Sequence, residues 1–211
     1  WLPVNPEEAK RLKKVTIVAC GTAYHAGVYG QYAIEKLARI PTEAAIASEY
    51  RYRDPIVGED ELFIAVSQSG ETADTLAALR EAKRRGAHVI ALCNVVGSTL
   101  SREAGEENTL YTYAGPEIAV ASTKSFLGQV VSLTLLAMLL AQVKGKLKTN
   151  QVRLLFHELA DTAEQVERIL ADCDRQGIWL LTCQDAAYPE RLLQIGDYPL
   201  VLYGRGRQFR F

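Results

Sequence analysis

Short runs of apolar and β-branched residues alternate along this chain with longer amphipathic segments. The intervening segments, such as His25–Arg39 and Thr72–Arg85, have helical periodicity. Nearly uninterrupted apolar runs are typical of strands that are buried on both faces of a sheet. Because strands that alternate with helices form parallel sheets covered on both sides, the pattern predicts an α/β fold with a five-stranded parallel sheet. The predicted strands are Val15–Ala19, Thr42–Ala47, Leu62–Val66, Ala87–Leu92 and Asn108–Thr112.

The chain continues past this sheet with a basic, glycine-containing linker and a long charged helix, Gln151–Gln176, which ends at Gly177. A strand at Ile178–Thr182, a short helix at Pro189–Leu193 and a strand at Leu200–Tyr203 follow. We therefore predict a domain at residues 1–145, a linker and connecting helix at 146–176, and the beginning of a second, incomplete α/β unit at 177–211.

The composition excludes several classes of function. The 211 residues include 24 Lys and Arg against 25 Asp and Glu, a net charge of -1. This balance gives no electrostatic reason to expect nucleic acid or an anionic membrane as a partner. The four cysteines form no CxxC pair and the three histidines show no ligand spacing, so we predict neither a metal site nor a cofactor. Free thiols, and an N-terminus that lacks the features of a signal peptide, predict a cytoplasmic location.

One segment, Phe126–Val143, carries no charge and has the length of a membrane span. Polar residues interrupt it at Gln129, Ser132, Thr134 and Gln142. We interpret it as a helix that is buried in a core or in a subunit interface, and we expect a homodimer.

A polar loop, Ser67–Thr72, lies between a predicted buried strand and a predicted helix. The first N–H groups of a helix are unpaired and its dipole is positive there, so such a loop suits phosphate or another small anion. Ser67, Ser69 and Thr72 would add hydroxyl donors, and Gln68 an amide donor. The alternative is an ordinary strand-to-helix turn with a good cap.

A second loop, Cys20–Ala23, follows another predicted strand, and Gly21 lets the backbone approach a ligand. Because ligands of parallel sheets bind at the carboxyl ends of the strands, we expect the two loops to converge on one crevice. A tight turn without a ligand is the alternative.

Several nearby residues have local alternatives. His25 is a weak candidate for a general base, and a packed or surface histidine is the simpler interpretation. We expect Glu71 to face solvent or a basic neighbour, and Lys124 either to be solvated or to contact an anion. Ser48 is predicted to cap a helix over 49–52. Gly86 is predicted to end the helix Thr72–Arg85.

Four segments together resemble the glucosamine-6-phosphate synthase family, the isomerising glutamine–fructose-6-phosphate aminotransferases. The segments are Val18–Gly27, Ile46–Arg53, Ser67–Leu76 and Glu117–Phe126. The resemblance covers about residues 10–145, and more loosely the helix that ends near Arg175. It points to the first of the family's two sugar isomerase (SIS) subdomains. It implies a three-layer α/β/α, flavodoxin-like SIS fold with a five-stranded parallel sheet.

The resemblance also implies a site for a hexose 6-phosphate, either fructose 6-phosphate or glucosamine 6-phosphate. The matching phosphate loop comprises Ser67, Gln68, Ser69 and Thr72, with Thr22 reaching the same ligand. Val120 and Ser122 match contacts to the sugar. Ala23 stands where the family commonly has serine, which removes one potential polar contact.

No catalytic residue is assigned, because the family's glutaminase domain, second SIS subdomain and C-terminal tail lie outside the matched region. The resemblance therefore implies a sugar-phosphate-binding domain that is inactive alone, since proton transfer needs those acid–base groups. The alternative is a regulatory or dimerisation module with a vestigial sugar site.

The last part of the chain has a second, shorter resemblance. Gly177–Thr182, Tyr188–Leu192 and Pro199–Gly204 are similar to the start of the DNA-processing protein A family, which protects single-stranded DNA. Tyr203–Arg207 is also similar to the strand that opens the second SIS subdomain. A net charge of -1 argues against binding of single-stranded DNA.

Overall fold

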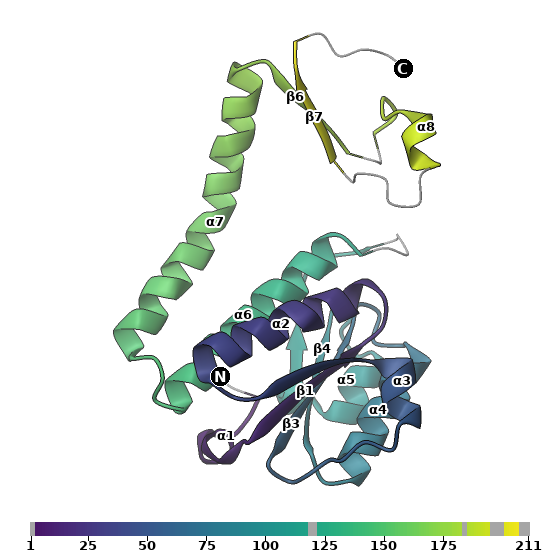
Figure 1. Ribbon diagram of the computed structural model, residues 1–211, viewed down its shortest axis with the longest axis vertical. Helices are drawn as coiled ribbons and strands as arrows, with labels where there is room; N and C mark the ends of the chain where they lie inside the picture. The colour runs from purple at the N-terminus through teal and green to yellow at the C-terminus, as the bar shows by residue number, and fades with distance from the viewer. Residues whose placement is uncertain (1–2, 118–121, 183–184, 195–200, 207–211) are drawn as a thin grey trace. The chain divides into compact units, whose positions relative to one another are not determined.

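The computed structural model describes residues 3–117, 122–182, 185–194 and 201–206 (Figure 1). The chain divides into two compact units, Trp1–Leu154 and Leu155–Phe211, and each is described by itself.

The first unit contains a five-stranded sheet with the strand order β2-β1-β3-β4-β5, in which all neighbours are parallel. This is the flavodoxin-like order, and it confirms the predicted parallel sheet. Every residue of the central strand β3 is buried, which explains why its sequence shows no alternation of polar and apolar residues. The strands are β1 (Lys14–Ala19), β2 (Thr42–Ile46), β3 (Glu61–Ser67), β4 (His88–Cys93) and β5 (Thr109–Tyr111).

Helices cover both faces of this sheet and give the predicted three layers (Figure 1). One face carries α2 and α6, and the other carries α3, α4 and α5. The helices are α1 (Pro6–Arg11), α2 (Thr22–Ala38), α3 (Ala47–Tyr52), α4 (Ala73–Arg84), α5 (Thr99–Ala104) and α6 (Lys124–Val143), with a 3-10 turn at Glu106–Asn108.

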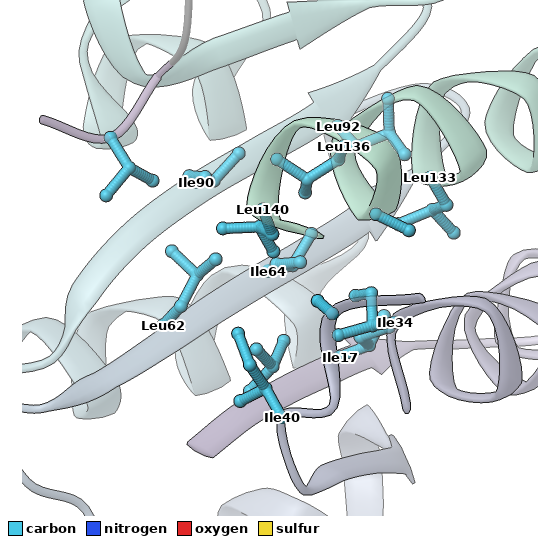
Figure 2. Packing of buried hydrophobic residues seen from close by; sticks show 14 of the residues in the cluster. Ile17, Ile34, Ile40, Leu62, Ile64, Ile90, Leu92, Leu133, Leu136 and Leu140 are labelled. Atoms are coloured by element: carbon cyan, nitrogen blue, oxygen red, sulfur yellow. The ribbon is translucent and has the colours of Figure 1, made fainter. Parts of the chain in front are cut away.

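The larger apolar core lies between the sheet and the α2–α6 pair (Figure 2). Ile17 and Ile64 from the sheet meet Ile34 of α2 and Leu133 and Leu136 of α6, and all five are essentially inaccessible to solvent. Helix α6 is long and apolar enough to cross a membrane, but a core helix passes the same test. Its buried side chains against the sheet support the interpretation as a core helix.

Two predicted helix starts are wrong, and one predicted helix end is confirmed. Helix α2 begins at Thr22 rather than His25, because Gly21 adopts φ +57° and turns the chain directly from β1 into the helix. Strand β2 leads straight into α3, so Ser48 lies inside that helix and does not cap it. Gly86 follows α4 with φ +93°, and its N–H donates to the carbonyl of Lys83.

The second unit contains most of α7 (Thr149–Arg175), the strands β6 (Ile178–Thr182) and β7 (Val201–Arg205), and the short helix α8 (Glu190–Leu193). The two strands pair antiparallel, a direction that the sequence had not indicated. Leu200, the predicted first residue of the last strand, lies outside the described residues.

Candidate functional site

The candidate site lies where the order of the strands reverses. Strand β1 leads through α2 to β2 on one side, and its neighbour β3 leads through α4 to β4 on the other. Helices α2 and α4 therefore depart to opposite faces, and a crevice forms at the carboxyl ends of β1 and β3. A cavity of about 240 Å³ occupies this position. Its lining comprises Cys20, Gly21, Thr22, Ala23, Val66, Ser67, Gln68, Ser69, Thr72 and Ser122.

The structure brings together the predicted site residues that it describes, from three segments far apart in the sequence. They are Thr22, Ser67, Gln68, Ser69, Thr72 and Ser122. Val120 lies outside the described residues. Ala23 also lines the cavity, so a serine at this position would place a hydroxyl there.

The hydroxyl groups of the Ser67–Thr72 loop are held by its own backbone. The Ser67 Oγ accepts a hydrogen bond from the Gly70 N–H at 3.1 Å and lies 3.0 Å from the Thr72 Oγ1. The Ser69 Oγ accepts from the Glu71 N–H at 3.2 Å. A hydroxyl that accepts in this way keeps its own proton for another partner. The loop can therefore donate hydrogen bonds to a ligand in the cavity.

The loop between β4 and α5, together with the first residues of α5, supports the Ser67–Thr72 loop. The Leu100 N–H donates to the Gly70 carbonyl at 2.9 Å, and the Asn94 N–H donates to the Gln68 carbonyl at 3.0 Å. Glu71 is exposed, as expected, and its Oε1 accepts from the Thr99 N–H at 2.8 Å. This bond, together with the charge of Arg102, lowers the pKa of Glu71. The carboxylate is thus bound at the start of α5.

Two helix N-termini meet at the cavity. Helix α2 begins at Thr22, and α4 begins at Ala73 directly after Thr72, whose side chain does not cap it. The unpaired N–H groups and the positive dipole end of each helix favour an anion. None of the described residues lining the cavity is Lys or Arg. Attraction for an anion must therefore come from N–H groups, hydroxyls and helix dipoles.

Other polar candidates lie outside the cavity lining. His25 is exposed on α2, in agreement with the surface interpretation, and Lys124 is exposed at the start of α6. Cys20 lines the cavity as a half-buried free thiol. Across the described part of the chain, no three His, Cys, Asp or Glu side chains gather as metal ligands.

Sequence reasoning missed the role of Glu117 beside this cavity. Its Oε1 accepts from the N–H (2.6 Å) and hydroxyl (3.0 Å) of Thr123. Its Oε2 accepts from the Ser122 hydroxyl (3.1 Å) and the Ser125 N–H (3.2 Å). Desolvation raises the pKa of Glu117, but the bonds from Ser125, Thr123 and Ser122 outweigh it and lower the pKa to about 2. A carboxylate this far before a helix has no standard capping spacing, so the sequence carried no signal for it.

Comparison with known proteins finds close relatives of this chain. A protein from Clostridium tetani, named glutamine–fructose-6-phosphate aminotransferase [isomerizing], is 55% identical over 169 residues, which are 80% of this chain and 28% of that protein. The solved C-terminal domain of glucosamine-fructose-6-phosphate aminotransferase from Francisella tularensis is 43% identical, with a TM-score of 0.70. That match covers 74% of this chain and 43% of the solved one.

A further relative extends the similarity into the second unit. The protein of the same name from Corynebacterium glutamicum is 48% identical over 206 residues, which are 96% of this chain and 32% of that protein. An alignment of this extent must include most of residues 177–211, so the similarity to these aminotransferases is not confined to the first unit. The resemblance to the DNA-processing protein A family stays a prediction.

The matched relatives are much longer than this chain, which spans about 28% of the length of the Clostridium tetani protein. The sequence profile of the SIS domain matches residues 10–139. This match runs from α1 through all five strands and most of α6, and it covers more than half of the chain. The chain therefore belongs to the SIS domain family.

Proposed function

We propose that this chain binds a hexose 6-phosphate in the cavity, with the phosphate on the Ser67–Thr72 loop. The observation that carries the proposal is the convergence of the Ser67, Ser69 and Thr72 hydroxyls with the N-termini of α2 and α4. A phosphate dianion has only acceptors, so a surface rich in donors suits it. The names of the relatives point to fructose 6-phosphate as the ligand, and the family resemblance adds glucosamine 6-phosphate.

Within this proposal, the lining residues divide into two groups. Thr22 and Gln68 would join the loop hydroxyls around the phosphate, because they line the cavity at the carboxyl ends of β1 and β3. Ser122, which lies just before α6, would contact the sugar. Val120 is proposed as a sugar contact on the family resemblance alone.

We propose binding without turnover for this chain alone. Moving a proton between two carbon atoms of a sugar requires a positioned acid or base. Apart from the Cys20 thiol, none of the described lining residues offers such a group, since none is a histidine, a lysine or a carboxylate. The aminotransferase activity in the relatives' names belongs to proteins of which the chain spans about 28%. A cytoplasmic location is part of the proposal, supported by the free thiols of Cys20, Cys93 and Cys173.

Calorimetric titration with fructose 6-phosphate and glucosamine 6-phosphate tests this proposal. The double variant Ser69→Ala/Thr72→Ala should weaken binding by about 1–3 kcal/mol, because it removes hydrogen bonds to a charged group. The matched control, Ser132→Ala/Thr162→Ala, removes two hydroxyls that do not line the cavity and should bind as the wild type does. Folded wild-type protein that gives no heat at millimolar ligand contradicts the proposal. Unchanged affinity of the first variant places the phosphate elsewhere.

A second candidate function, assembly of a homodimer, is favoured by one exposed surface. Leu127 and Val131 on α6 are 63% and 39% exposed, and Tyr29 and Tyr32 on α2 are 43% and 67% exposed. The Thr134 Oγ1 lies 3.2 Å from the Tyr29 hydroxyl oxygen, so the two helices form one surface. Light scattering should show a dimer for the wild type and a monomer for Leu127→Glu/Val131→Glu. A wild-type monomer at high concentration contradicts this candidate.

A further inference from the structure

We infer that Glu117 is a positioning residue that fixes Ser122 as a hydrogen-bond acceptor toward the cavity, so that this end of the cavity selects ligands with a donating hydroxyl group. The inference rests on the proposed function and deepens it. It assigns the recognition of the sugar to a defined pair of side chains, and it separates that recognition from the binding of phosphate.

The direction of one hydrogen bond carries the inference. The Ser122 Oγ lies 3.1 Å from the Glu117 Oε2, and Ser122 also lines the cavity. An ionised carboxylate only accepts, so the serine must donate its single proton to Glu117. The lone pairs of Ser122 that remain can then only accept a hydrogen bond from a ligand.

The carboxylate of Glu117 is itself fixed by α6. The backbone N–H groups of Thr123 and Ser125 donate to its two oxygens at 2.6 and 3.2 Å, and the Thr123 hydroxyl adds a bond of 3.0 Å. Thr123 is the N-cap residue of the 20-residue helix α6, and Ser125 lies in its first turn. Both carboxylate oxygens are therefore held in place, and Ser122 is oriented by a rigid element of the core.

The Ser67–Thr72 loop lines the same cavity and has the complementary chemistry. The Ser69 Oγ accepts from the Glu71 N–H, so its own proton is available to a ligand. Inorganic phosphate offers mostly acceptors and lacks the carbon-bound hydroxyl groups of a sugar, so the donating loop alone can bind it. A hexose phosphate offers acceptors on its phosphate and donors on its sugar hydroxyls, so it can use both the loop and Ser122. The arrangement thus distinguishes a phosphorylated polyol from phosphate alone.

The test compares two ligands on the full chain by NMR titration of ¹⁵N-labelled protein. Glu117→Gln replaces the acceptor of the Ser122 proton by an amide and should weaken fructose 6-phosphate binding about 5–30-fold. It should leave binding of inorganic phosphate within about twofold. Ser122→Ala should show the same selectivity, and the double variant should lose no more than the larger single loss, because both changes remove one unit.

Thr162→Ala serves as the matched control, because it removes a hydroxyl that neither lines the cavity nor bonds to Glu117. It should bind fructose 6-phosphate within about twofold of the wild type. Equal losses for both ligands in Glu117→Gln, or additive losses in the double variant, overturn the inference in favour of a merely structural cap. If Glu117→Gln does not fold, Glu117→Asp takes its place in the same cycle, since it keeps the charge and shortens the side chain.

Failure of hexose phosphate binding and failure of the role of Glu117 give different results. A wild-type protein that binds neither ligand contradicts the proposed function. A wild-type protein that binds fructose 6-phosphate, with a Glu117→Gln variant that binds it equally well, contradicts only the role of Glu117.

Discussion

Gly70 lies directly against Ser98: a Cβ atom added at Gly70 would be 2.1 Å from the Ser98 Oγ and 2.5 Å from the Ser98 Cβ. Gly70 also has φ +68°, a conformation that side-chain-bearing residues rarely adopt. Both constraints act on the loop that carries Ser67 and Ser69. The shape of the candidate phosphate loop therefore depends on the loop between β4 and α5.

Replacing Gly70 by alanine should lower the free energy of unfolding by about 2–4 kcal/mol, because a strained backbone conformation is added to a clash with Ser98. Urea unfolding measures the change. Gly97→Ala is the matched control, since Gly97 has φ +71° and a Cβ there would meet no heavy atom within 4 Å. It should lose only about 1–2 kcal/mol, the cost of the backbone conformation. Equal losses in the two variants would show that the contact with Ser98 has no energetic effect.

Glu117 should make the protein more stable at neutral pH than in acid. Its pKa is about 2 in the folded chain against an ordinary value of 4.5, so its contribution is full above about pH 4.5 and is lost as the pH falls toward 2. The wild type should exceed Glu117→Gln by about 1–2 kcal/mol at pH 7, the usual value of a helix cap. Unfolding by urea at a series of pH values measures this difference, which should shrink only below pH 4.5. Glu167→Gln, which removes an exposed carboxylate on α7, should show little difference at any pH.

Gln129 on α6 is fully buried, and neither polar atom of its amide has a hydrogen-bond partner among the described residues. Gln129→Met, an apolar side chain of similar shape, should raise the free energy of unfolding by about 1–2 kcal/mol, because it removes unpaired polar atoms from the interior. Leu136→Met, a change at a buried apolar position of the same helix, should bring no gain. Destabilisation by Gln129→Met would indicate that a buried water molecule binds the amide.

Binding of fructose 6-phosphate should depend only weakly on salt. No lysine or arginine is among the described residues that line the cavity, so few mobile counterions need to be displaced. We expect the affinity to change less than about threefold between about 50 and about 500 mM NaCl, since contacts in a confined site are screened less than exposed charges. Calorimetry at several salt concentrations measures this. A steeper loss would indicate that a cationic side chain outside this lining contacts the ligand.

Much of the fold could be predicted because its signals are local. The apolar run of β3 identifies a central strand without knowledge of any long-range contact. The polar loop that follows it identifies the edge of the sheet at which ligands bind. The start of α2 and the supposed cap at Ser48 were wrong, because a helix start depends on the backbone direction of the preceding strand. That direction is set by φ at Gly21 before α2, and by the direct entry of β2 into α3.

Features that depend on distant or irregular contacts could not be predicted. The contact of Gly70 with Ser98 joins two loops that only the folded sheet brings together. Glu117 receives its hydrogen bonds from residues five to eight positions later in the chain, a spacing that no short motif specifies. Within the site, the proposed role of Val120 stays a prediction.

Helices α2 and α4 start at one cavity but belong to different apolar cores, one on each face of the sheet. A ligand bound by both first turns would favour only those conformations in which both layers are folded. Its free energy of binding would then add to the stability of each layer at once. The two cores would then unfold as a single cooperative unit when the ligand is bound. Hydrogen exchange of the amides in α2 and α4 should therefore slow in parallel as the ligand concentration rises.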